Sequence, residues 1–223
     1  MISLEKQGNV FVLRMQNGEN RYNPDTVREL HGVLDQVEAA ADPIALVTVG
    51  DGKFYSNGLD LDWMSKAGAK EAFENVGHVH GLLARMLGFP CVTVAAINGH
   101  AFAAGAMFAL AHDFRVMRSD RGYFCLPEVD IGMTFTDSME SLITARLSKF
   151  TAHEAMVTGR RYTSAEALAG SIVHHSVGDA EVLPTAVALA EKNAKPSRTT
   201  IAGIKRSLFK ETLAIMAKES QPR

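Results

Sequence analysis

The chain has 223 residues, of which 47% are hydrophobic and 22% charged, and its formal net charge is −2 at pH 7. This composition is typical of a globular protein with a full hydrophobic core, and the weak charge gives no electrostatic reason to expect nucleic acid or an anionic membrane as a partner. No apolar run approaches the roughly 20 residues that would span a bilayer. Two cysteines in apolar runs, Cys91 and Cys125, predict buried reduced thiols in a reducing compartment.

The termini do not match a targeting signal. The first residues, MISLEKQGNVF, lack the basic segment and apolar run of a secretory signal. The last four residues, Ser220 to Arg223, do not match a peroxisomal address of the Ser-Lys-Leu type. We therefore expect a cytoplasmic protein, with a peroxisomal location left open.

The chain opens with a strand and a helix. The run VFVLRM predicts a strand over Val10–Met15. After a turn-rich segment, Asn23 and Pro24 are typical of a helix cap and a first helical residue. Apolar residues then recur at helical spacing, which predicts an amphipathic helix over 24–40.

Short apolar strands follow. Ile44–Gly50 and Cys91–Asn98 are continuous apolar runs, and FRVMR (114–118) and GYFCLPEVDI (122–131) are expected to be further strands. Fully apolar strands that alternate with helices are typical of a parallel sheet covered on both faces. The fold class predicted here is therefore α/β.

From residue 137 onward the pattern is mainly helical. We expect helices over 137–148, 151–158, 164–170, 182–194 and 198–217, with a short strand over 172–177. The predicted organisation is an α/β core over residues 1–178 and a helical C-terminal segment of the same unit over 179–223. The sequence leaves open whether the last helices cover their own core or a neighbouring subunit.

Two loops rich in small residues follow apolar strands. They are Gly52–Met64 and Asn98–Phe108, and they lead into predicted helices at Leu59–Ser65 and Ala103–Ala111. The first turn of a helix has backbone N–H groups without intrahelical partners, and these favour negative charge. Two such loops facing each other would form an oxyanion hole. The alternative is that the small residues only allow helices and strands to pack closely.

Glu128 is the candidate acid/base. It follows Pro127 among apolar residues, where the charged form of a carboxyl group is disfavoured and its pKa should rise. Such a group can both accept and donate a proton near neutral pH. The alternative is an exposed loop glutamate, or an ion-pair partner of Arg115 or Arg118.

The other polar residues give little indication of a catalytic or metal-binding role. His78 and His80 do not share a helix face and lack nearby ligands, so we expect no metal site. His100 is expected to be structural, and His112 to close a helix end. No nucleophile-elbow motif surrounds Ser56, which argues against a hydrolase triad.

Four segments in order resemble the enoyl-CoA hydratase/isomerase, or crotonase, family. SNGLDL and INGHAFAAGAMFALAHDFRV are similar to its two oxyanion motifs, and YFCLPEVDIGMTFTDSMESL to its catalytic segment. GRRYTSAEALAGSIVHHSV (159–177) is similar to a later helix-glycine-strand signature, so the resemblance extends from about Val10 to Phe209. Within the family, the phrases FYSNGLDL and LPEVDIG are most similar to the Δ3,Δ2-enoyl-CoA isomerases of the plant peroxisomal type.

The resemblance implies a fold, a substrate and catalytic groups. The implied fold is a spiral of ββα units whose terminal helices drive trimer formation, so a homotrimer or hexamer is expected. The implied substrate is an acyl-CoA, with no cofactor apart from the coenzyme A of the substrate itself. The implied oxyanion donors are the N–H groups of Leu59 and Ala104, and the implied acid/base is Glu128. Asp137 is the alternative base, although it also suits a helix N-cap.

One substitution separates the reactions of the family. Hydratases use two carboxylates, and the resemblance assigns these positions to Met107 and Glu128. Hydration requires a group that orients water, whereas moving a double bond requires one carboxylic acid in a dry pocket. Met107 therefore favours an isomerase of fatty-acid β-oxidation. A hydratase or another enzyme acting on CoA thioesters is the alternative, and a non-catalytic acyl-CoA-binding protein is a third.

The resemblance also implies ligand contacts. The expected contacts with coenzyme A are Arg21, Tyr22, Ser56, Asn57, Gly58, Asp60, Leu61, Lys205 and Arg206. The expected walls of the acyl pocket are Trp63, Met64, Met107, Phe108, Phe124, Pro127 and Phe135. Each of these residues has a structural alternative, namely a solvated charge or a core side chain.

Overall fold

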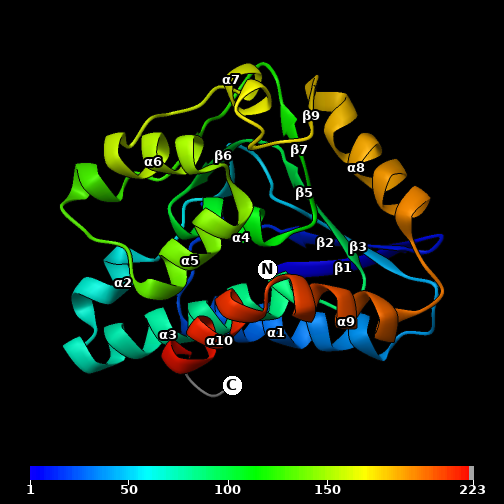
Figure 1. The fold of residues 1–223 in the computed structure, drawn as a ribbon, viewed down its shortest axis with the longest axis horizontal. Helices are drawn as coiled ribbons and strands as arrows, with labels where there is room; N and C mark the ends of the chain where they lie inside the picture. The colour runs from blue at the N-terminus through cyan, green and yellow to red at the C-terminus, as the bar shows by residue number, and fades with distance from the viewer. Residues whose placement is uncertain (221–223) are drawn as a thin grey trace.

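A six-stranded sheet organises the structure, a computed structural model that describes residues 1–220 (Figure 1). The strand order is β1-β2-β3-β5-β7-β9, and all neighbouring pairs from β2 to β9 are parallel. The strands are β1 (Ile2–Gln7), β2 (Val10–Met15), β3 (Ala45–Val49), β5 (Val92–Ile97), β7 (Phe114–Arg118) and β9 (His175–Val177). The predicted parallel sheet is thus confirmed. β1, which was not predicted, adds an antiparallel edge strand that is half-buried over Ile2–Leu4 and exposed over Glu5–Gln7.

A second, smaller sheet makes the fold a spiral. Its strands β4 (Phe54–Ser56), β6 (His100–Phe102) and β8 (Phe124–Cys125) are also parallel and adjacent in that order. Each follows one strand of the large sheet and precedes a helix, which repeats a ββα unit three times. These repeats stack in chain order, so the loops after β4, β6 and β8 come together.

The helices that follow the first two small strands differ in length. After β4 come α2 (Leu61–Lys66) and α3 (Ala69–Leu87), and after β6 comes α4 (Ala104–Ala111). α3 was not predicted, because charged and small residues fill its first half and only its second half has an apolar face. α1 (Pro24–Ala39) begins as expected, with the Asn23 side chain accepting a hydrogen bond from the backbone of Thr26.

The large sheet is buried on both faces. α8 (Asp179–Asn193) covers one face, where its side chains pack on alternate residues of the strands such as Val47. The opposite residues, such as Leu46, join the main core with α1, α3 and α4. Figure 1 shows α8 alone on its side of the sheet, with the other long helices across from it.

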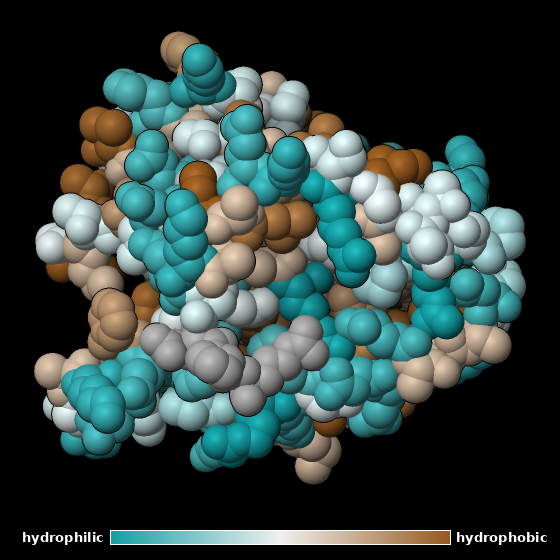
Figure 2. All heavy atoms as spheres, turned by 60° about the horizontal axis from the view of Figure 1, so that its bottom comes forward, coloured by the Kyte–Doolittle hydropathy of each residue, from teal (hydrophilic) through white to brown (hydrophobic). Residues whose placement is uncertain are grey.

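The last helices pack on their own chain. The helix predicted over 198–217 is broken at Phe209 into α9 (Arg198–Leu208) and α10 (Lys210–Glu219), and α10 packs against α3 and α5 (Asp137–Arg146). The face in Figure 2 is mainly hydrophilic, with hydrophobic side chains in small groups. The proposed division of the chain at residue 178 remains a prediction.

Some predicted boundaries are wrong. The strand expected over 122–131 is only β8, because Pro127 is followed by a 3₁₀ helix, η1 (Glu128–Ile131). The N-cap of α5 is Thr136, whose hydroxyl accepts from the backbone of Met139, and Asp137 is the first helical residue. The other late helices are confirmed as α6 (Lys149–Thr158) and α7 (Ser164–Ala169). Both cysteines are buried and free, as expected, and no helix within residues 1–220 is long and apolar enough to cross a membrane.

Candidate active site

The three segments singled out in the sequence meet at one cavity of about 310 Å³. It lies among the loops that follow β4, β6 and β8, together with the start of α5. Its walls are formed by Arg21, Asn57, Leu59, Leu61, Asp62, Phe102, Ala103, Ala104, Pro127, Glu128, Ile131, Met133, Thr134 and Met139. The spiral repeat is the reason for this meeting, since it brings equivalent loops of successive units side by side.

The first loop is held by Tyr22 and bent by a glycine. The backbone N–H of Tyr22 donates to the carbonyl of Gly58 at 2.8 Å, and its carbonyl accepts from Asp60 at 3.1 Å. Gly58 has φ +81°, and a Cβ there would lie 3.0 Å from the backbone nitrogen of Ala104. Only glycine therefore allows the first loop to lie this close to the second.

The second loop makes a similar bend without a glycine. Ala103 has φ +48° and ψ −126°, a conformation that costs a non-glycine residue about 1–3 kcal/mol. It is held there because its N–H donates to the carbonyl of Cys125 at 3.0 Å. The residue after each bend, Leu59 in the first loop and Ala104 in the second, lines the cavity.

The N–H groups of Leu59 and Ala104 have no hydrogen-bond acceptor among residues 1–220. Ala104 is the first residue of α4, where no intrahelical acceptor exists and the helix dipole favours negative charge. Two free donors in one cavity can bind one oxygen on which charge develops. The geometry therefore supports the expected oxyanion hole.

The run of small residues allows α4 to approach β4. A Cβ at Gly105 would lie 2.4 Å from the carbonyl oxygen of Ser56. Ser56 is itself fully buried, and its hydroxyl donates to the carbonyl of Asn20 at 2.7 Å and accepts from the N–H of Gly58 at 3.2 Å. Close packing is thus confirmed as one reason for the small residues, and it leaves room for an oxyanion hole at the same place.

Glu128 is the buried carboxyl group of the cavity. It opens η1, the residue is 5% exposed, and its Oε2 atom is buried without a hydrogen-bond partner among residues 1–220. Burial raises the pKa of Glu128 to about 7, because removing the charged form from water is costly. Arg115 is not its ion-pair partner, since Arg115 donates to main-chain carbonyls. A carboxyl group with this pKa can take and return a proton near neutral pH.

The alternative base and the position of a second carboxylate both lie outside the cavity. Asp137 is exposed and does not contribute to the cavity wall. Met107 is fully buried in the core of α4 and does not line the cavity, so its expected place in the acyl pocket is wrong. Asp62 is the other carboxylate of the wall, and it is 77% exposed and paired with Arg21.

The seven expected contacts with coenzyme A in and around the first loop divide into three groups. Arg21, Asn57 and Leu61 line the cavity, and Gly58 shapes it through its backbone. Asp60 caps α2 by accepting from Trp63, and it lines an adjoining depression of about 600 Å³. The side chains of Tyr22 and Ser56 are fully buried and cannot contact a nucleotide.

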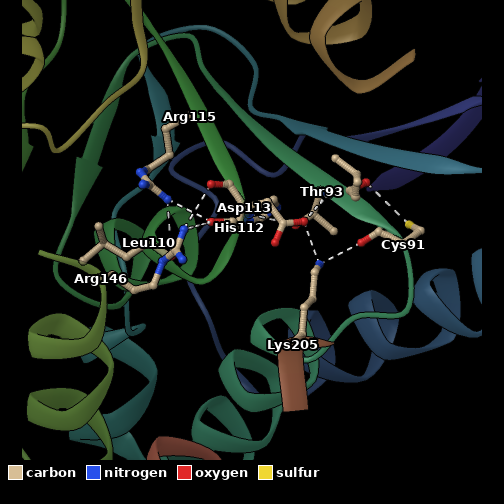
Figure 3. Close-up of polar contacts among 9 residues, drawn as sticks. Cys91, Thr93, Leu110, His112, Asp113, Arg115, Arg146 and Lys205 are labelled. Atoms are coloured by element: carbon tan, nitrogen blue, oxygen red, sulfur yellow. Dashed lines mark hydrogen bonds and ion pairs between the residues drawn. The ribbon is translucent and has the colours of Figure 1, made fainter. Parts of the chain in front are cut away.

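Lys205 is a structural residue rather than a ligand contact. Its ammonium group donates to the carbonyl of Cys91 at 2.7 Å and pairs with Asp113 at 2.6 Å. Figure 3 shows this side chain pointing from α9 toward Cys91 and Asp113, which lie just before β5 and β7. Arg206 is exposed and lines a separate hollow beside Arg85. Neither residue therefore reaches the cavity of its own chain.

The acyl-pocket expectations are mostly wrong. Pro127 lines the cavity, and Trp63 lines the adjoining depression. The other five expected residues, Met64, Met107, Phe108, Phe124 and Phe135, do not line the cavity. Of these, Phe108 and Phe124 are fully buried in the core. The apolar walls that were missed are Phe102, Ile131, Met133 and Met139. A sequence signal for two of them was available, because the apolar residues Ile131 and Met133 flank Gly132 shortly after the candidate acid/base Glu128.

The histidines lie where a structural role requires them. His112 ends α4: its Nδ1 lies 2.7 Å from the carbonyl of Phe108, and its Nε2 lies 2.9 Å from the hydroxyl of Thr48. His100 packs among the rings of Phe54, Phe102 and Tyr123. Within residues 1–220 no group of three or more His, Cys, Asp or Glu residues is placed to hold a metal ion.

Known proteins share this sequence and fold. The family model described as Enoyl-CoA hydratase/isomerase matches residues 5–221. Enoyl-CoA delta isomerase 2, peroxisomal, from Arabidopsis thaliana is 36% identical over 233 residues, covering 99% of this chain and 97% of that protein. Enoyl-CoA delta isomerase 3 from the same plant is 37% identical, covering 95% and 93%.

A solved structure agrees in the fold. Human mitochondrial delta3-delta2-enoyl-CoA isomerase superposes with a TM-score of 0.89 at 25% identity, covering 97% of this chain and 86% of that chain. The match extends over both sheets and the C-terminal helices. The sequence motifs, the spiral of ββα units and these matches agree, and the chain belongs to the enoyl-CoA hydratase/isomerase family.

Proposed function

We propose that this chain is a Δ3,Δ2-enoyl-CoA isomerase, which moves the double bond of a 3-enoyl-CoA to the 2-position in fatty-acid β-oxidation. The observation that carries the proposal is the buried Glu128, whose Oε2 has no hydrogen-bond partner among residues 1–220, in a cavity lined by Leu59 and Ala104, whose N–H groups have no acceptor in that part of the chain. The plant relatives named as enoyl-CoA delta isomerases support it.

In the proposed reaction the thioester oxygen accepts hydrogen bonds from Leu59 and Ala104. The Glu128 carboxylate removes a proton from C2, and the electron pair of the broken C–H bond spreads over a dienolate whose charge rests mainly on that oxygen. The protonated Glu128 then delivers the proton to C4, and the double bond forms between C2 and C3. The acid/base is restored, so no further proton donor is needed.

Hydration would require a group that holds and activates water. Met107 stands at the position where the family resemblance places a second carboxylate, and its thioether cannot serve. Asp62, at the rim, is paired with Arg21. The apolar walls Ile131, Met133 and Met139 favour exclusion of water and leave the acyl chain in apolar surroundings.

The remaining parts of the assignment are also proposals. Arg21, Asn57 and Leu61 are proposed to hold the coenzyme A part of the substrate, and no other cofactor is required by the reaction. A homotrimer or hexamer is proposed from the family resemblance. A cytoplasmic location is proposed, with the peroxisome as the alternative because two plant relatives, enoyl-CoA delta isomerases 1 and 2, are named as peroxisomal.

The decisive experiment is product analysis. Purified protein is incubated with 3-enoyl-CoA esters of several chain lengths, and the position of the double bond is followed. Accumulation of 2-enoyl-CoA supports the proposal. Formation of 3-hydroxyacyl-CoA from a 2-enoyl-CoA would identify a hydratase instead, and binding of these esters without any turnover would identify a non-catalytic protein.

A further inference from the structure

Arg21 stands between the cavity and the adjoining depression, and it lines both. Its Nε donates to Oε2 of Glu19 at 2.7 Å, and its Nη1 pairs with Oδ2 of Asp62. The nearest oxygen of Asp60 lies 3.8 Å from the same Nη1. The guanidinium is thus occupied by carboxylates on two edges, while its side chain stays 32% exposed.

The two carboxylates that accept hydrogen bonds from Arg21, those of Glu19 and Asp62, are held differently. Oε2 of Glu19 also accepts from the side-chain amide of Asn57 at 2.8 Å, so Glu19 is part of the loop structure. Asp62 is 77% exposed, and within residues 1–220 its carboxylate contacts only Arg21. An exposed ion pair of this kind contributes at most about 1 kcal/mol. Asp62 can therefore leave Arg21 at little cost, whereas Glu19 keeps the arginine in position.

The surroundings are unfavourable for an anionic ligand. The depression is lined by three carboxylates, Glu19, Asp60 and Asp62, and by two cationic side chains, Arg21 and Lys66. Coenzyme A carries several negatively charged phosphate groups. The planar guanidinium binds phosphate and carboxylate with the same geometry, so a phosphate and the Asp62 carboxylate would compete for one edge of Arg21.

We propose that Asp62 is an internal substitute for a phosphate group of the acyl-CoA. In the free protein it occupies the outer edge of Arg21, and the ligand displaces it on binding. Asp62 is then a residue that limits affinity for the nucleotide half of coenzyme A. This inference rests on the proposed acyl-CoA function, because it assumes that Arg21 meets the phosphates.

The test compares two ligands in binding experiments that need no turnover. Asp62→Asn keeps the shape of the side chain and removes its charge. The Kd of free coenzyme A, measured by calorimetry, should fall about fivefold, as expected for loss of one exposed competing carboxylate. The Kd of pantetheine, which has no phosphate, should stay unchanged. An unchanged or larger Kd for coenzyme A would overturn the proposal.

Two control variants locate the effect. Asp25→Asn removes another exposed aspartate paired with an arginine, Arg28, on α1, and it should not change the Kd of coenzyme A. Asp62→Asn is also combined with Arg21→Gln. The fivefold gain should vanish without Arg21. If the gain persists there, Asp62 acts by repulsion through space and not by occupying the arginine, and the proposal fails.

Failure of this inference can be told apart from failure of the isomerase assignment. If 3-enoyl-CoA is isomerised but Asp62→Asn leaves the Kd of coenzyme A unchanged, the substitute role is wrong and the assignment stands. If Asp62→Asn tightens coenzyme A through Arg21 but no enoyl-CoA is isomerised, the substitute role stands and the assignment is wrong.

Discussion

The two ends of α4 differ in whether the backbone groups without intrahelical partners are hydrogen-bonded. At the C-terminal end, Arg146 donates to the carbonyls of Leu110 and His112, and Arg115 also donates to His112. Figure 3 shows both guanidinium groups converging on this end of the helix. At the N-terminal end, Ala104 lines the cavity, and its N–H has no acceptor among residues 1–220.

This difference indicates that the C-terminal end of α4 contributes to stability and the N-terminal end to function. Helix ends that are buried need partners for their free backbone groups, and at the C-terminal end of α4 the carbonyls of Phe108, Ala109 and Leu110 have them. Within residues 1–220 the N–H of Ala104 at the N-terminal end lacks a partner, and so does Oε2 of Glu128 in the same cavity. Unpaired groups that share a cavity indicate a place where a ligand supplies the partner.

The largest expected effect is at the N-terminal end. Glu128→Gln should lower kcat for isomerisation about 10³-fold, because the amide cannot take the proton from C2. The free energy of unfolding should not fall, since the variant removes a buried charge that has no partner. Steady-state kinetics and chemical denaturation on the same sample check both parts. Full activity in this variant would contradict the role of Glu128.

At the C-terminal end of α4, a substitution should lower stability and leave catalytic activity unchanged. Arg115→Met should lower the free energy of unfolding by about 2 kcal/mol, because the buried carbonyl of Ile172, which accepts from Nε of Arg115 at 2.6 Å, loses its donor. Activity per folded molecule should remain. Arg28→Met, on an arginine whose side chain is 75% exposed, is the control and should change stability little. A loss of kcat without a loss of stability in Arg115→Met would contradict this division.

The pKa of Glu128 predicts a pH dependence in both activity and stability. Its pKa of about 7 lies above the ordinary value of 4.5, so the folded protein binds more protons than the unfolded chain between these values. Folding is therefore penalised increasingly as pH rises from 4.5 to 7, by up to about 3 kcal/mol. Wild type should lose stability relative to Glu128→Gln over this range, while kcat/KM rises as the carboxylate forms. Parallel stability curves for the two proteins would argue against the raised pKa.

A smaller effect is expected from the bend beside the N-terminal end. Gly58→Ala places a Cβ 3.0 Å from the nitrogen of Ala104, which should displace the two N–H donors and lower kcat about 10²-fold. Gly52→Ala is the matched control, because Gly52 also has a positive φ, +61°, but nothing lies within 4 Å of the added atom. Equal loss of kcat in both variants would mean that backbone strain, and not the contact with the second loop, is responsible.

Much of the site could be predicted from local sequence. Each expected N–H donor, and the expected acid/base, lies in a strand–loop–helix segment that about ten consecutive residues are enough to recognise. The family resemblance then shows that these segments belong to one site. Glu128, Leu59 and Ala104 were therefore predicted, and all three line one cavity. The apolar strands of the large sheet and the helix cap at Asn23 were predicted for the same reason, because a few neighbouring residues identify each of them.

The sequence by itself determined the fold family, the segments that meet and the chemical groups that they carry. Only the tertiary structure decided which side chains face the cavity: it buries Tyr22 and Lys205, turns Met107 into the core and exposes Ile131 to the cavity. It also imposes the strained φ of Ala103. The physical reason is that burial and strain depend on contacts between residues far apart in the chain, such as Lys205 with Asp113, which no local pattern records.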